Sequence, residues 1–263
     1  MARYDLIIPI GMTCKCTHNL RLFHRQFQSL PFDWILVPDL HTVHTALSTH
    51  FADFMKFENM EFKCKESEQT DIYFDRLTGF GFWHDFPHGV ALEQSFRAVK
   101  EKYNRRIARL FELISQAQNI LFVRVVTVHP DCDYSMKNII FQKSVIDDNL
   151  LEEQFLSLRA LYPDKNLSLA EISVFNEPHP FVKRVLSPYI TRFEVYSPQK
   201  YEWQGQRKVF RKILSGYKLT YCVWLRFMLN SLKFKCLKSL VSLGAFFGIS
   251  KYQEQKKLFK RHK

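Results

Sequence analysis

Acidic residues are nearly missing from the C-terminal quarter of this 263-residue chain. Only Glu202 and Glu254 follow residue 199, against 16 Lys and Arg residues. The first 199 residues hold 24 acidic and 22 basic residues, so the net charge of +12 comes from the C-terminal part. The sequence therefore predicts a near-neutral body over residues 1–199 and a basic segment over residues 200–263. Such a basic end attracts polyanions.

Glycine is scarce as well, with 8 residues against 25 Phe, and 46% of the chain is hydrophobic. This composition excludes collagen-like, low-complexity and disordered chains, and it suffices for one sizeable core. The six cysteines contain no CxxC pair and no paired ligand spacing for zinc, so no metal site is expected. No cofactor is expected either. The apolar run in MARYDLIIPIG is too short for a signal peptide, which favours a reducing cytosol and free thiols.

Hydrophobic periodicity predicts alternating strands and helices in the body. Residues 4–10 and 119–128 are apolar enough for buried strands, and residues 91–117 have the spacing of a long amphipathic helix. Further expected elements are a helix from Thr13, a helix over 39–57 capped by Asp39, extended chain over 60–82, a helix over 149–161, and strands over 169–175 and 190–196. The sequence thus predicts an α/β fold, with a central mixed or mostly parallel sheet flanked by helices in a single domain. A C-terminal basic amphipathic helical segment follows it.

Cys14 stands where a strand gives way to a helix. The stretch Gly11-Met12-Thr13-Cys14 follows the first strand directly. A helix N-terminus provides unpaired N–H groups and a partial positive charge, and both lower the pKa of a thiol. The N–H groups around Thr13 and Cys14 could also hold an oxyanion. The alternative is that Cys14 is a small buried hydrophobe. Cys16, two residues further on, would point elsewhere on the helix.

A thiol nucleophile needs a base, and His84 is the first candidate. His84 and Asp85 interrupt the aromatic stretch Gly81-Phe82-Trp83-His84-Asp85-Phe86, where unpaired polar groups would be costly. Asp85 or Asp33 would orient the histidine. Adjacent side chains on an extended chain point in opposite directions, which counts against Asp85. Asp33 could equally be a cap. His129, which follows the strand at 119–128, is the second-choice base.

Several short motifs resemble a known family when they are taken together and in order. They are strand-Gly-x-x-Cys ending at Cys14, Leu20-Arg21, Pro31-Phe32-Asp33-Trp34-Ile35, His84-Asp85-Phe86, Lys102-Tyr103-Asn104-Arg105-Arg106-Ile107 and Leu121-Phe122-Val123-Arg124. Over residues 4–196 the chain resembles a bacterial family described as putative papain-like cysteine peptidases (domain of unknown function 1796).

The resemblance implies that Cys14 is the nucleophile and His84 its histidine. It places Arg105, Arg106 and Arg124 at basic positions that could hold an anionic substrate. The resemblance also implies that family members occur beside enzymes of surface-polysaccharide biosynthesis. The first hypothesis is therefore a cysteine-dependent hydrolase or acyltransferase acting on a peptide, acyl or glycan-related substrate. The alternative is a non-hydrolytic accessory protein or transferase of glycan assembly, which binds a phosphorylated sugar or lipid carrier and in which Cys14 is structural.

The basic segment mixes apolar and charged residues. Lysines and arginines interrupt residues 209–249 often enough to disfavour a spanning helix. An in-plane helix at an anionic membrane is expected, which predicts a cytoplasmic protein held peripherally at the inner membrane. Docking on the body or on a partner protein is the alternative, and nucleic acid is not expected because no binding motif is present. The residues expected to face the lipid are Trp224, Phe227, Leu232 and Phe234.

Overall fold

The computed structural model describes residues 2–128, 147–175, 177–198 and 204–229. The chain divides into two compact units, Met1–Lys218 and Leu219–Lys263. The division falls later than residue 199 because helix α5 (Arg207–Leu214) belongs to the first unit. Its apolar side chains are buried there, and they would be exposed if the body ended before it: Phe210, Ile213 and Leu214.

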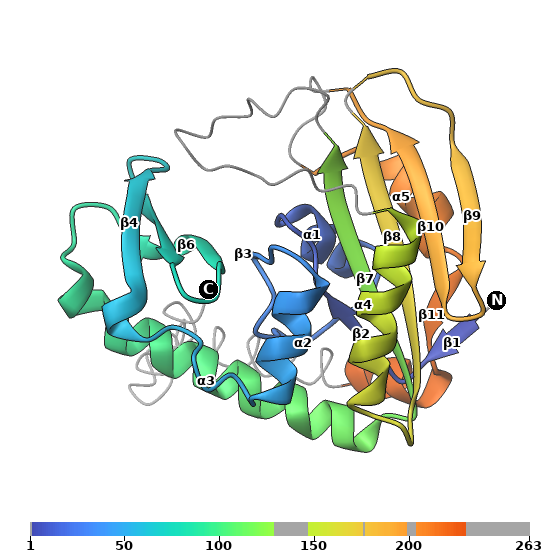
Figure 1. Cartoon of the computed structure of the whole chain (residues 1–263), viewed down its shortest axis with the longest axis horizontal. Helices are drawn as coiled ribbons and strands as arrows, with labels where there is room; N and C mark the ends of the chain where they lie inside the picture. The colour runs from blue at the N-terminus through green and yellow to red at the C-terminus, as the bar shows by residue number, and fades with distance from the viewer. Residues whose placement is uncertain (1, 129–146, 176, 199–203, 230–263) are drawn as a thin grey trace, which may run out of the picture. The chain divides into compact units, whose positions relative to one another are not determined.

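A five-stranded sheet forms the centre of the first unit, in the order β2-β7-β8-β10-β9 (Figure 1). Strands β2, β7, β8 and β10 run parallel, and β9 lies antiparallel at the edge. This arrangement confirms the predicted α/β fold with a mostly parallel sheet. The strands are β2 (Leu6–Pro9), β7 (Asn119–Val128), β8 (Asn166–Phe175), β9 (Val182–Ser187) and β10 (Ile190–Tyr196).

Helices cover both faces of this sheet, as continuous apolar strands require. In Figure 1, α2 and α4 lie in front of the sheet, and α1 and α5 lie behind it. Phe122 of β7 meets Phe155 of α4 with ring centroids 6.4 Å apart. On the other face, the Cys16 thiol of α1 donates to the Val123 carbonyl over 3.1 Å. The helices are α1 (Lys15–Leu22), α2 (Leu40–Ser48), α3 (Leu92–Gln116) and α4 (Asp148–Ala160).

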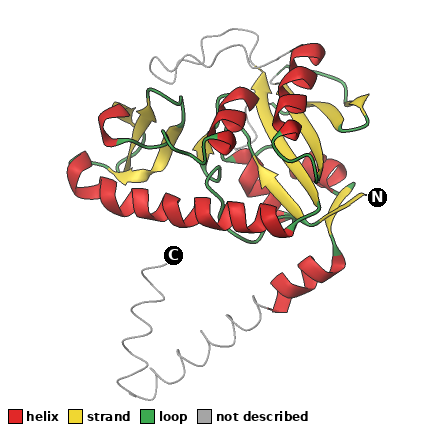
Figure 2. Cartoon of the chain, turned by 60° about the horizontal axis from the view of Figure 1, so that its bottom comes forward, coloured by secondary structure: helices red, strands yellow, loops and turns green. Residues whose placement is uncertain are grey.

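A second, antiparallel sheet has the order β3-β6-β5-β4. Figures 1 and 2 show the long helix α3 running along both sheets. Tyr103 of α3 packs against Phe54 and Phe82, at 5.4 and 5.5 Å between ring centroids, which ties the second sheet to the helix. The strands are β3 (Ile35–Leu36), β4 (Met60–Lys65), β5 (Thr70–Asp75) and β6 (Gly81–Pro87), with a 3-10 turn at Phe57–Asn59 and a separate pair of β1 (Ala2–Tyr4) and β11 (Tyr217–Leu219).

The observed elements depart from the predicted ones at a few places. The helix expected over 39–57 begins as predicted, with Asp39 accepting from the Thr42 N–H over 2.7 Å. It ends at Ser48 because His50 and Phe51 adopt left-handed φ values of 52° and 59°. Phe51 is nevertheless buried, so it belongs to the core although it lies outside the helix.

The second unit is described only over residues 219–229 and is helical over 221–229. Leu232 and Phe234, expected to face lipid, lie outside the described residues. Within the described part of the chain, no helix is both long and apolar enough to cross a membrane.

Candidate active site

Cys14 is the N-cap residue of α1, at the carboxyl end of β2. The Ile10 and Met12 N–H groups continue the pairing of β2 with β7, donating over 2.8 and 3.0 Å. Gly11 lies between them, and a Cβ there would stand 2.6 Å from the Cys16 Cβ. The sheet therefore extends almost to the thiol, and glycine is required where α1 approaches the chain. Sites of parallel α/β sheets lie at this strand end.

His84 reaches Cys14 from the second sheet. The Cys14 Sγ and His84 Nε2 atoms are 3.3 Å apart. Phe82 pairs with Tyr73 and Phe86 pairs with Asp71, so β6 has three residues where β5 has one. His84 is the middle residue of this bulge and is exposed. Bulges commonly re-aim a side chain beside a site, and this one turns the imidazole toward α1.

The thiol is neutral in the resting site. Burial raises the pKa of Cys14 from its ordinary 9.0 to about 12, and the negative charges of Asp85 and Glu66 add to the effect. The residue's own backbone N–H opposes the shift without reversing it. The expectation that the helix N-terminus would lower this pKa is therefore wrong, because desolvation outweighs the helix. With the thiol protonated, Sγ–H can donate to Nε2, the nitrogen that faces it.

Asp33 does not orient His84. Its buried carboxylate accepts from Arg21 Nη2 over 2.7 Å, from Gln26 Nε2 over 2.8 Å and from the Leu30 N–H over 3.1 Å. The Thr17 hydroxyl lies 3.5 Å away. Thr17 and Arg21 follow Cys14 at positions i+3 and i+7, so all three lie on one face of α1. Asp33 therefore fixes the helix that carries the thiol, which is a positioning role that the sequence did not predict.

The backbone turns sharply at Trp34, directly after Asp33. Trp34 has a left-handed φ of 65°, an unusual conformation for a bulky residue. Strand β3 begins at the next residue, Ile35, which pairs with Phe82, so the pairing of β3 with β6 does not extend to His84. The Arg21 guanidinium lies 5.6 Å from the Trp34 ring centroid. Arg21 of α1 therefore contacts both the Asp33 carboxylate and the ring of the strained Trp34.

Asp85 faces away from His84, as alternation on a strand requires. Its carboxylate forms an ion pair with Lys102 and accepts from the Tyr103 hydroxyl over 2.8 Å. Burial raises the pKa of Tyr103 well above its usual range, which keeps this phenol a donor. Among the described residues no acid bonds His84, so the structure brings together a Cys–His pair without a third member. His129 lies outside the described residues.

The three arginines expected at the substrate differ in their surroundings. Arg124 is buried, donates to Glu171 Oε2 over 2.7 Å and reaches the Pro38 carbonyl, so it is a structural residue and not a ligand for substrate. Arg105 is exposed on α3, and Arg106 is half-buried with its guanidinium 5.1 Å from the Tyr103 ring centroid. Only Arg105 and Arg106 remain candidates for an anionic substrate.

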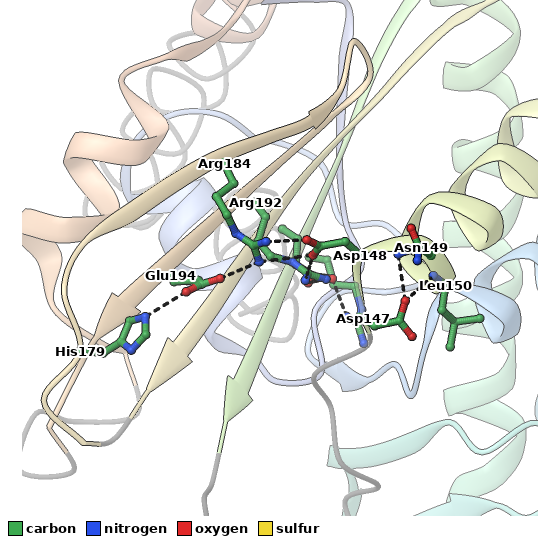
Figure 3. Close-up of polar contacts among 10 residues, drawn as sticks. Asp147, Asp148, Asn149, Leu150, His179, Arg184, Arg192 and Glu194 are labelled. Atoms are coloured by element: carbon green, nitrogen blue, oxygen red, sulfur yellow. Dashed lines mark hydrogen bonds and ion pairs between the residues drawn. The ribbon is translucent and has the colours of Figure 1, made fainter.

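Arg124 belongs to a row of charges that crosses the central sheet. The register aligns Arg124 of β7 with Glu171 of β8, and Glu171 with Arg192 of β10. Arg192 also pairs with Asp148 at the start of α4, and Figure 3 shows Asp148 shared with Arg184. Glu194 joins Arg184 to His179 at the outer end, also drawn in Figure 3. The row ties α4 to the sheet.

In the part of the chain that is described, no group of His, Cys, Asp or Glu has the size needed for a metal site.

Comparison with known proteins identifies the family to which the chain belongs. A family described as putative papain-like cysteine peptidase (domain of unknown function 1796) matches residues 5–157. The chain is also similar to the uncharacterized protein R408 of Acanthamoeba polyphaga mimivirus, at 27% identity over 141 residues. That match covers 47% of this chain and 63% of the viral protein, so the chain spans less than two thirds of its relative. The relative is viral, and a bacterial origin stays a prediction. No solved structure matches.

Proposed function

Because the chain belongs to the family of putative papain-like cysteine peptidases, we propose that it is a thiol hydrolase, with Cys14 as nucleophile and His84 as general base. The observation that carries the proposal is the 3.3 Å approach of Sγ to Nε2 across two sheets. Residues 70 positions apart meet there, one at a helix start and one on a strand bulge. A buried structural cysteine would need no such partner.

The reaction follows from the protonation state of the pair. Sγ attacks the carbonyl carbon of an amide or ester while its proton passes to His84 Nε2. The carbonyl oxygen becomes an oxyanion, which the N–H groups at the start of α1 would stabilise. The imidazolium then returns the proton to the departing amine or alcohol, leaving a thioester on Cys14. Water, deprotonated by His84, attacks the thioester and releases the acid and the free thiol.

The substrate is proposed to be a peptide or another acyl compound, and the link to surface-polysaccharide biosynthesis remains a proposal. The alternative function, binding of a phosphorylated sugar or lipid carrier, has less support because Arg124 is committed to Glu171. Arg105 and Arg106 would have to hold the phosphate. That alternative also assigns no role to the contact between Cys14 and His84.

Turnover of a panel of fluorogenic peptides and aryl esters tests the proposal. We expect Cys14→Ala to lose turnover to background, because no other atom can form the thioester. Cys64→Ala is the matched control, since Cys64 is also a half-buried free thiol and lies on β4. It should retain full turnover. Hydrolysis that persists in Cys14→Ala would refute the assignment, whereas loss in both variants would point to instability, which a thermal melt detects.

A further inference from the structure

The outward side of α5 carries four basic residues and no acidic one. Arg207, Lys208, Arg211 and Lys212 are all exposed and are called the α5 basic face below. None of the four forms an ion pair with a described residue. Arg207 and Arg211 are spaced i, i+4, as are Lys208 and Lys212, and like charges at this spacing destabilise a helix. Basic residues in its first turn also oppose the helix dipole.

The fold holds this unfavourable helix firmly in place. Phe210, Ile213 and Leu214 are buried beneath it. The Arg25 side chain donates to the Leu214 carbonyl over 3.1 Å, and Asn19 of α1 donates to the Gln204 carbonyl over 2.8 Å. The basic face is therefore a fixed feature of the first unit, and its four charges face the solvent.

Aromatic rings accompany the charges. Lys212 Nζ lies 3.9 Å from the ring centroid of Phe181, which is 40% exposed, and the Arg211 guanidinium lies 5.9 Å from that of Phe23. Basic groups next to a partly exposed aromatic ring are typical of surfaces that rest in the headgroup region of a bilayer.

We propose that the α5 basic face binds the anionic headgroups of a lipid bilayer. The chain that follows supports this choice over nucleic acid, because it adds apolar residues as well as charge. Tyr221, Leu225 and Leu229 are exposed and spaced i, i+4, i+8, on one side of the helical residues 221–229. No acidic residue occurs between Glu202 and Glu254. The proposal is independent of the chemistry at Cys14.

Co-sedimentation of the full chain with vesicles tests the proposal. Each basic residue at an anionic leaflet changes binding by about five-fold, so Arg207→Gln/Arg211→Gln should weaken binding to phosphatidylserine-containing vesicles about 25-fold. Arg76→Gln/Arg97→Gln is the matched control, because it removes the same charge from two other exposed arginines. It should bind as the unchanged protein does. On pure phosphatidylcholine vesicles, the α5 double variant should bind no differently from the unchanged protein.

Two outcomes would overturn the proposal. Equal weakening by both double variants would mean that only total charge matters. An α5-dependent affinity for a single-stranded oligonucleotide, with vesicle binding unaffected by the α5 substitutions, would assign the face to nucleic acid. A thermal melt of each variant confirms that the fold is retained, which is expected because both α5 substitutions are on exposed side chains.

Discussion

His84→Gln is expected to lower turnover at neutral pH by about 100- to 10,000-fold, the usual contribution of a general base. The reason is the protonation state of the nucleophile. Burial raises the pKa of Cys14 to about 12, so almost no thiolate exists at pH 7 unless His84 accepts the proton. Glutamine cannot accept it. The initial rate of ester hydrolysis measures the loss.

The residual rate of His84→Gln should also depend on pH in a definite direction. Below a pKa of about 12, the thiolate fraction grows about tenfold with each pH unit, so the residual rate of His84→Gln should rise steeply from neutral to alkaline pH. The rate of the unchanged protein should rise less, because His84 accepts the thiol proton during the attack. His41→Gln, an exposed histidine on α2, is the control and should behave as the unchanged protein does. Full activity in His84→Gln at pH 7 would exclude its role as base.

Glu171→Gln is expected to lower the free energy of unfolding by about 3–5 kcal/mol, the cost of leaving a buried charge uncompensated. Glu171 lies between Arg124 and Arg192, at 2.7 and 2.8 Å, and all three side chains are almost fully buried. Glutamine keeps the side-chain volume and one hydrogen-bond acceptor. It removes the negative charge that lies between the guanidinium groups of Arg124 and Arg192. The loss of stability therefore reports electrostatics and not a cavity.

Equilibrium unfolding in urea measures this effect. Glu153→Gln is the matched control, because Glu153 is exposed on α4 and forms no ion pair within the described chain. Its effect should stay within about 0.5 kcal/mol, as is usual for surface substitutions. If Glu171→Gln changed stability as little as the control does, the charge row would be solvated and the description of a buried row would be wrong.

The central sheet could be predicted from the sequence because its strands are continuous apolar runs. Residues 119–128 have the composition of a strand covered on both faces, and β7 occupies that range. The Asp39 cap was visible because its spacing to Thr42 is local. Strand β9 escaped prediction, since an exposed edge strand alternates weakly, and α5 escaped because its charge suggested a separate tail.

The sequence positions of Cys14 and His84 indicated the candidate pair. They did not indicate which residues contact the other polar candidates. Cys14 and His84 stood out as polar groups at a strand end and within an aromatic stretch. Asp33 and Asp85 stood out as acids among apolar residues, whereas the family resemblance indicated Arg124. Each proved to be committed to a charged partner on another element. A single sequence shows that a buried charge needs compensation but not which residue compensates it. The bulge at His84 likewise depends on pairing with β5, which no local pattern encodes.

The most direct test of the account is to trap the thioester. An aryl ester substrate is mixed with the protein, the reaction is quenched with acid during turnover, and the peptide that carries the added acyl mass is identified by mass spectrometry. If Cys14 is the nucleophile, the acyl group lies on Cys14 and is missing from Cys14→Ala. Hydrolysis of the ester with no acyl group on Cys14, or with the group on another residue, would contradict it.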